Sequence, residues 1–218
     1  PRTEARRLLN LPPTGPMALF FGFIRKYKGL DLLLEALAQT PDIQLVIAGE
    51  CYEDWAFYQR IITEHNLSGR IHLFNDFIPT EQIKMFFSAA DLVVQPYRSA
   101  TQSGISQIAY HFEKPMVVTR VGGLPEIVSD GVCGYVVSPE PDAIAAAMRD
   151  FFEKKLKKKS SLMNFVIKAR EILSLESNVQ EVKCPVKASL RRAASPLRKK
   201  RTRVARVCLS NNTPCRLT

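Results

Sequence analysis

Residues 17–37, MALFFGFIRKYKGLDLLLEAL, predict how the chain folds. The first five residues are apolar and rich in β-forming types, and Gly22 ends the run. Leucines then recur at the three- and four-residue intervals of one face of an amphipathic helix: Leu30, Leu33, Leu34 and Leu37. A strand, a short loop and a helix follow one another here, which is typical of a parallel α/β sheet.

The same alternation continues to about residue 153. Further apolar runs predict strands at residues 43–48, 71–74, 92–94, 116–118 and 135–137. Helices are predicted between them, at residues 55–65, after a capping Thr80, at 103–112, from Pro125 and at 141–152. The run at 43–48 is apolar at nearly every position, which indicates a strand buried on both faces. The predicted fold class is therefore α/β, with a doubly wound, Rossmann-like parallel sheet in residues 17–153.

Loops at one edge of this sheet are the predicted ligand site. Right-handed crossovers bring the carboxyl ends of all parallel strands to the same edge, and ligands bind in the crevice there. The loops at this edge are predicted at residues 22–29, 49–55, 75–79, 96–104 and 119–126.

The first of these loops combines a glycine with a cluster of cations. Gly22 permits a close backbone approach, and Arg25, Lys26 and Lys28 follow it. They precede a helix, whose amino-terminal end has partial positive charge. The loop therefore suits a diphosphate, and the alternative is a solvated basic surface loop.

Two further loops contain small residues next to helix starts. The loop at 96–104 is either a second anion cradle or an ordinary helix start capped by Thr101 or Ser103. The loop at 119–126 has paired glycines, which favour a tight turn or a close approach to a ligand. Glu126 at its end either holds a sugar hydroxyl or caps the short helix that Pro125 begins.

Composition limits the classes of protein to consider. The chain has 218 residues, and no apolar run approaches the ~20 residues that span a bilayer. No basic segment followed by an apolar stretch marks a secretory signal at the start. Five cysteines at irregular spacing predict free thiols in a reducing compartment, hence a cytoplasmic location. Three histidines without ligand spacing give no reason to expect a metal site.

The charge divides the chain into two parts. Residues 1–153 contain 13 Lys and Arg against 18 Asp and Glu, whereas residues 154–218 contain 18 against 3. An apolar stripe predicts an amphipathic helical extension at 154–182. Residues 183–218 form a basic tail that we expect to be disordered, because it has too few apolar residues to bury a core.

Several segments together resemble the C-terminal half of a known enzyme family, the group-1 (family 4) glycosyltransferases of the GT-B fold. The matching segments are residues 21–31, 46–49, 91–97, 100–104, 114–115 and 122–126, in that order. The resemblance implies that the domain is one half of a GT-B fold. It also implies a retaining enzyme whose substrate is a nucleotide-diphosphate sugar, normally bound without a metal ion or other cofactor.

The resemblance also assigns site residues. Arg25 and Lys28 would neutralise the diphosphate of the leaving group, and the base would lie near Phe77. The implied donor-binding set is Gly22, Arg25, Lys28, Phe77, Thr101, Gln102, Ser103, Gly104, Ile105 and Glu126. No catalytic residue is assigned.

Two positions depart from the family pattern. Phe23 stands where the family most often has its arginine. Residues 98–112 contain no acid, and Ile108-Ala109 occupies the place of a second glutamate, so that Gln102 or Gln107 is left as the substitute ribose contact.

The resemblance leaves an acceptor domain unaccounted for. Residues 1–16 are predicted to be a linker remnant, and the expected partner is a missing N-terminal acceptor domain without which the chain is inactive. The alternative is a non-catalytic nucleotide-binding module whose basic tail binds an acidic surface. For the tail itself three interpretations remain: it binds an anionic membrane surface at the inner face, it binds nucleic acid, which we do not favour, or it follows from an altered reading frame after about Lys154.

Overall fold

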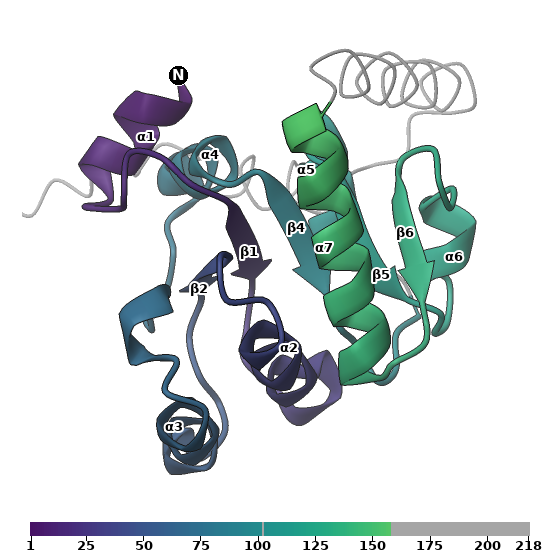
Figure 1. The fold of residues 1–218 in the computed structure, drawn as a ribbon, viewed down its shortest axis with the longest axis horizontal. Coiled ribbons are helices and arrows are strands. Elements are labelled where there is room, and N and C mark those ends of the chain that lie inside the picture. Colours follow the sequence, from purple (N-terminus) through teal and green to yellow (C-terminus); the bar gives the residue numbers. More distant parts are fainter. Residues whose placement is uncertain (102, 158–218) are drawn as a thin grey trace, which may run out of the picture. The chain divides into compact units, whose positions relative to one another are not determined.

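Six parallel strands form one sheet in the computed structural model, which describes residues 1–101 and 103–157 (Figure 1). The strands are β1 (Met17–Phe21), β2 (Gln44–Ala48), β3 (Ile71–Phe74), β4 (Leu92–Gln95), β5 (Met116–Thr119) and β6 (Gly134–Val137). Their order is β3-β2-β1-β4-β5-β6, and every neighbouring pair is parallel. The predicted strands and the doubly wound parallel sheet are therefore confirmed. The winding reverses between β1 and β4, and this is where ligands bind in such sheets.

The helices lie where the periodicity places them, except that the first was not predicted and two others differ in detail. They are α1 (Arg2–Leu8), α2 (Leu30–Ala38), α3 (Trp55–Glu64), α4 (Thr80–Ala89), α5 (Gly104–His111), α6 (Leu124–Ile127) and α7 (Pro141–Lys157), with short 3-10 helices at Lys26–Lys28 and Ser68–Arg70. The prediction that Thr80 caps its helix is wrong, because Thr80 is the first helical residue and Pro79 precedes it. Helix α7 extends beyond 152, since the residues that follow are good helix formers.

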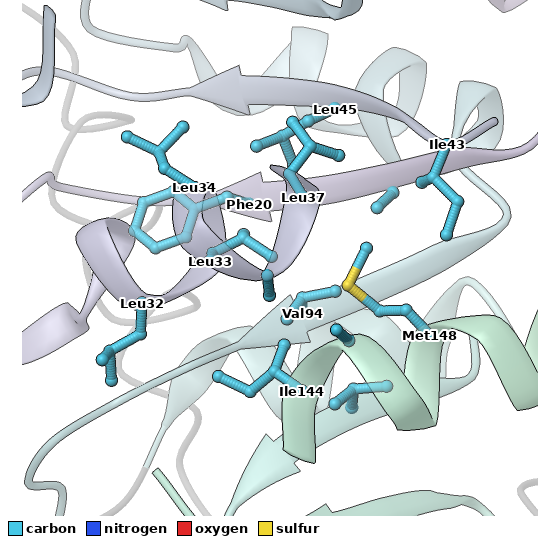
Figure 2. Packing of buried hydrophobic residues seen from close by; sticks show 14 of the residues in the cluster. Phe20, Leu32, Leu33, Leu34, Leu37, Ile43, Leu45, Val94, Ile144 and Met148 are labelled. Atoms are coloured by element: carbon cyan, nitrogen blue, oxygen red, sulfur yellow. The ribbon is translucent and has the colours of Figure 1, made fainter. Parts of the chain in front are cut away.

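Helices cover both faces of the sheet, and alternate strand residues supply two separate cores. Ala18 and Phe20 of β1 belong to the core beneath α2, α3 and α7 (Figure 2). Met17, Leu19 and Phe21 belong to the opposite core, beneath α1, α4, α5 and α6. Every residue of β1 is thus buried, which explains why the strand is a continuous apolar run.

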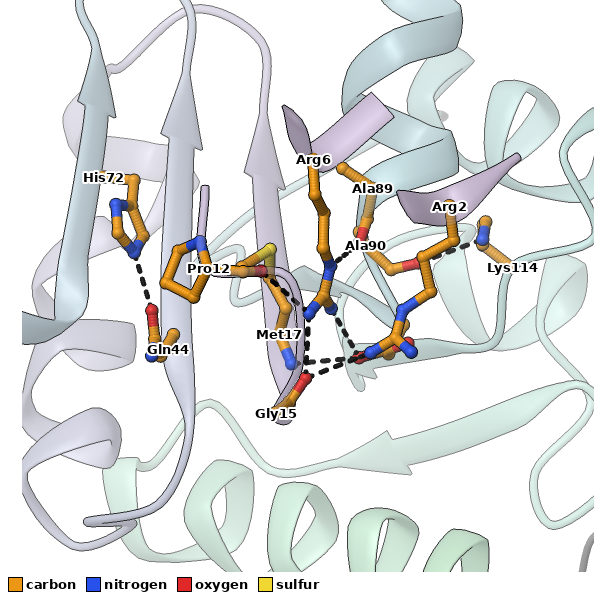
Figure 3. A network of polar contacts seen from close by, with 11 residues as sticks. Arg2, Arg6, Pro12, Gly15, Met17, Gln44, His72, Ala89, Ala90 and Lys114 are labelled. Carbon is orange, nitrogen blue, oxygen red and sulfur yellow. Dashed lines mark hydrogen bonds and ion pairs between the residues drawn. The ribbon is translucent and has the colours of Figure 1, made fainter. Parts of the chain in front are cut away.

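The segment before β1 is packed and partly helical. Arg6 of α1 is fully buried, and its guanidinium donates to the carbonyl of Ala89 and to the carboxylate of Asp91, at 2.9 and 3.0 Å (Figure 3). The same carboxylate oxygen accepts bonds from Arg2 and from the backbone N–H of Met17. The linker remnant predicted at residues 1–16 therefore contains a helix held against the start of β1 and β4.

The described residues all lie within the first of the two units into which the chain divides. Residues 154–157 continue α7, and the rest of the predicted extension at 154–182 lies outside the described residues, as does the basic tail at 183–218. In the described part of the chain, no helix has the length and hydropathy needed to cross a membrane.

Candidate functional site

Two of the predicted loops meet at the point where the winding of the sheet reverses. The loop after β1 contains Lys28, whose ammonium donates a 2.8 Å hydrogen bond to the hydroxyl of Tyr97 in the loop after β4. The backbone N–H of Arg98 donates to the carbonyl of Tyr27 at 2.7 Å, which joins the same loops a second time. Residues 22–29 and 96–104 therefore lie together at the carboxyl edge of the sheet.

Gly22 lies close to both Lys28 and the first turn of α5. A Cβ atom on Gly22 would be 3.5 Å from the Cδ1 of Ile105 and 3.9 Å from the Nζ of Lys28. Its φ of +106° is one that side chains disfavour. The structure thus brings together three of the predicted site residues: Gly22 after β1, Lys28 in the loop that follows, and Ile105 at the start of α5.

Lys28 is a partly buried cation that faces two aromatic rings. Its Nζ lies 4.3 Å from the ring centroid of Tyr97 and 5.8 Å from that of Tyr27. Within the described residues, none of the ion pairs involves Lys28. Burial lowers the pKa of Lys28 to about 8, because the charged form has lost hydration. An anion bound beside the ammonium would favour its protonated form again.

Arg25 points toward a different neighbour. Its guanidinium carbon lies 4.6 Å from the centroid of the Tyr52 ring, in the loop after β2. Tyr52 in turn donates a 2.8 Å hydrogen bond to the carboxylate of Glu50, and its ring meets that of Phe23 edge-on. The two cations that the resemblance pairs therefore contact different loops, Lys28 on the β4 side and Arg25 on the β2 side.

The start of α5 presents backbone N–H groups near Lys28. Ser103 precedes the first helical residue, Gly104, and among the described residues no side chain is seen to cap this end of the helix. The Ser103 hydroxyl instead lies 3.5 Å from that of Tyr97. The first N–H groups of an α-helix have no partner within the helix, so this end can accept an anion. Of the interpretations left open for this loop, capping by Ser103 is not observed. Gln102, a predicted donor-binding residue, lies outside the described residues.

The glycine pair after β5 fixes the position of the loop before α5. Gly123 donates a 3.1 Å hydrogen bond to the carbonyl of Thr101. A Cβ on Gly122 would lie 1.4 Å from the carbonyl oxygen of Ala100, a distance that excludes any side chain. Glu126 is exposed on α6. Gly123 precedes this helix, and no side-chain cap is seen at the helix start among the described residues, so capping by Glu126 is not observed.

The loops on the β2 and β3 side form a separate part of the edge. The side-chain oxygen of Asn75 accepts a 2.9 Å hydrogen bond from the backbone N–H of Cys51, which joins the loops after β2 and β3. Phe77 follows on the β3 side and is 69% exposed, so its ring is available for stacking.

The positions of the missing glutamate are occupied by core residues. Ala109 is fully buried in the core beneath α5, and Ile108 packs against the same core. These positions therefore cannot supply a ribose contact, whereas Gln107 of the same helix is exposed. Across residues 1–101 and 103–157, no group of three or more His, Cys, Asp or Glu side chains is placed to hold a metal ion.

Sequence reasoning assigned no role to Tyr97 or Thr119. Tyr97 is 2% exposed, and the hydroxyl of Thr119 donates a 2.5 Å hydrogen bond to its carbonyl. The signal available in the sequence was a tyrosine directly after Pro96 at the end of a buried strand. The direction of the Tyr97 side chain depends on β5, which is remote in sequence.

The chain matches a protein-family model and several curated relatives. The model described as glycosyl transferases group 1 matches residues 1–171. A D-inositol 3-phosphate glycosyltransferase of Mycolicibacterium gilvum is 33% identical over 163 residues, which cover 69% of this chain and 35% of the relative. One from Mycobacterium leprae is 32% identical over 143 residues, covering 62% and 32%. The chain spans about a third of the length of these relatives.

Solved structures share the fold. Sucrose-phosphate synthase from Thermosynechococcus elongatus superposes with a TM-score of 0.66 at 25% identity, over 88% of this chain and 49% of that one. The Anabaena protein HepE, solved in complex with UDP-glucose, gives 0.68 at 22% identity over 78% and 48%. The C-terminal domain of the group 1 family protein LpcC from Francisella tularensis gives 0.68 at 23% identity over 83% and 94%. The chain thus matches about half of the two longer proteins and nearly all of an isolated C-terminal domain.

Proposed function

The chain belongs to the group 1 glycosyl transferases, and we propose that its residues 17–153 bind a nucleotide-diphosphate sugar as the donor-binding half of a retaining glycosyltransferase. The observation that carries this proposal is Lys28, a partly buried cation without a carboxylate partner in the described structure. It lies beside Gly22 and Ile105, at the point where the winding of the sheet reverses.

A diphosphate fits this position for electrostatic reasons. The ammonium of Lys28 supplies a full positive charge, and the uncapped start of α5 adds N–H donors and the positive end of the helix dipole. Because Lys28 is partly buried, its interaction with phosphate is less screened than that of a surface lysine. Gly22 lets the phosphates approach the backbone, which a side chain would obstruct.

The same groups would assist sugar transfer. When the bond between the anomeric carbon and the β-phosphate oxygen breaks, the bonding electron pair stays with the departing nucleoside diphosphate. Lys28 and the N–H groups of α5 lie where they would stabilise that growing negative charge. Exposed Phe77 is the proposed stacking surface for the base, and exposed Glu126 the proposed contact for a sugar hydroxyl. Arg25 would join the diphosphate by leaving the ring of Tyr52.

The acceptor side is proposed to come from another domain. The chain matches nearly all of an isolated C-terminal domain from this family and about half of longer members of its fold. We therefore expect residues 1–218 alone to bind the donor but not to transfer sugar until an N-terminal acceptor domain is supplied. This expectation also separates the proposal from a purely binding module, which would stay inactive with that domain present.

The nucleotide and sugar are to be identified by titration calorimetry. UDP-glucose is the first probe, because the HepE structure contains it, and GDP- and ADP-sugars complete the panel. We expect saturable binding of at least one sugar nucleotide in the presence of EDTA, with the matching nucleoside diphosphate as a competitor. Absence of binding across the panel would contradict the proposed function.

A further inference from the structure

We propose that Tyr97 is a positioning residue, whose hydroxyl holds the ammonium of Lys28 at the diphosphate site and leaves its positive charge uncompensated. The role of the ammonium in binding a diphosphate rests on the function proposed above. The contact between Lys28 and Tyr97 is a property of the free protein, so it can be tested separately.

Tyr97 is itself firmly held. Its side chain is buried in the core beneath α5, and the hydroxyl of Thr119 donates to its carbonyl at 2.5 Å. The adjacent Arg98 donates its N–H to Tyr27, and its guanidinium forms an ion pair with Asp31 of α2. The backbone at Tyr97 is therefore held by β5 and α2 and its ring by the core, so the phenol oxygen offers the flexible lysine side chain an acceptor in a defined place.

The hydroxyl of Tyr97 has hydrogen-bonding partners on both sides. It accepts from the Lys28 ammonium at 2.8 Å and lies 3.5 Å from the hydroxyl of Ser103. Because the lysine occupies an acceptor site on the phenol oxygen, the phenol proton is free to point toward Ser103. Tyr97 thus connects the lysine after β1 to the residue that precedes α5.

A neutral partner suits a lysine that binds an anion. Burial raises the pKa of Tyr97 to about 12, so the phenol stays neutral at physiological pH. A phenol orients the ammonium through one hydrogen bond, whereas a carboxylate at the same place would cancel its charge and compete with phosphate. Arg98, the residue after Tyr97, is paired with Asp31 of α2. The ring of Tyr27 faces the ammonium from the other side, 5.8 Å away.

The test compares two tyrosine-to-phenylalanine variants of the full chain without ligand. Tyr97→Phe removes the acceptor, and Tyr27→Phe is the matched control, because it keeps the ring that faces Lys28. The pKa of Lys28 is measured by NMR titration of its ε-carbon, assigned with Lys28→Arg. We expect Tyr97→Phe to lower that pKa by about one pH unit, since the charged form loses a hydrogen bond, and Tyr27→Phe to leave it near the wild-type value. An unchanged pKa in Tyr97→Phe, or an equal change in both variants, would overturn the proposal.

Two further measurements keep the inference testable whatever the variants do. In the wild-type chain, the ring carbons of Tyr97 should respond to deprotonation of Lys28 near pH 8 more strongly than those of Tyr27, and an equal response would count against the proposal even if Tyr97→Phe failed to fold. As the pH is raised from 6.5 to 9, UDP affinity should begin to fall at a lower pH in Tyr97→Phe than in wild type. Coincident pH profiles would contradict the positioning role. If wild type binds no UDP while the Lys28 titration behaves as expected, the positioning contact stands and the nucleotide assignment fails.

Discussion

The ammonium of Lys28 donates a 2.8 Å hydrogen bond to the hydroxyl of Tyr97, although 69 residues separate them in the sequence. The bond joins the carboxyl ends of β1 and β4, which are neighbours in space because the sheet winds outward to β3 and then returns. It places at the reversal point a cation that has no carboxylate partner in the described part of the chain. The predictions below follow from this position and from the packing that maintains it.

Replacing Lys28 by methionine should stabilise the ligand-free protein. The lowered pKa of Lys28 means that folding disfavours its charged form. We expect Lys28→Met to raise the free energy of unfolding at pH 7 by about 1–2 kcal/mol, less than the full pKa change implies because the side chain is partly exposed. Urea unfolding measures this. The difference from wild type should shrink as pH rises from about 8 through 10.5, because the lysine becomes neutral first in the folded and then in the unfolded state. A difference that grew over this range would refute the assignment of its cause.

Donor affinity should fall as pH rises through 8. Below that value Lys28 is protonated and attracts the diphosphate, whereas above it the free protein loses this charge. Bound diphosphate stabilises the ammonium, so binding should be accompanied by proton uptake at pH 8 and above. Calorimetry in two buffers of different ionisation enthalpy detects this uptake. In Lys28→Arg, which stays charged, the decline near pH 8 should disappear.

A methyl group on Gly122 should disturb the site from the adjacent loop. It would overlap the carbonyl of Ala100 and push the loop before α5 away from Lys28. We expect Gly122→Ala to cost about 1–3 kcal/mol of stability and to weaken donor binding. Gly69→Ala is the control, because no atom lies within 4 Å of its added Cβ. Equal melting temperatures for the two variants would show that the close approach is unimportant.

The buried arginine before β1 should be important for stability. Removing its side chain leaves the Asp91 carboxylate buried with fewer partners. We expect Arg6→Ala to lower the free energy of unfolding by about 3–5 kcal/mol. Arg7→Ala on the same helix should have little effect, since its ion pair with Glu4 is exposed. Chemical denaturation of both variants checks this, and similar midpoints would argue against a structural role for residues 1–16.

Strands such as β1 and β5 could be predicted because each is an apolar run that is buried on both faces. Leu19 and Phe20 face opposite cores, so successive residues of β1 are all apolar. The strand can therefore be recognised from the local sequence alone. Helix α1 was not predicted, because its best-buried large side chain is an arginine, and two of the groups that it bonds, on Ala89 and Asp91, lie more than 80 residues away. No apolar stripe marks such a helix.

The loops that form the site could be predicted from the sequence, but the directions of their side chains could not. The topology alone brings residues 22–29 and 96–104 to one edge, as the alternation of strands and helices implies. The sequence could not show that Lys28 turns to Tyr97 while Arg25 turns to Tyr52, because each direction depends on a different neighbouring strand. The donor-binding roles of all ten residues stay predictions: Gly22, Arg25, Lys28, Phe77, Thr101, Gln102, Ser103, Gly104, Ile105 and Glu126.

The most direct test of the account is calorimetric titration of Lys28→Met with the sugar nucleotide that binds wild type most tightly. Lys84→Met, an exposed lysine on α4, is the matched control. The account predicts that affinity falls about 10- to 100-fold in Lys28→Met, the contribution of a charge-assisted hydrogen bond, and stays at the wild-type value in Lys84→Met. Unchanged affinity in a folded Lys28→Met protein would contradict it.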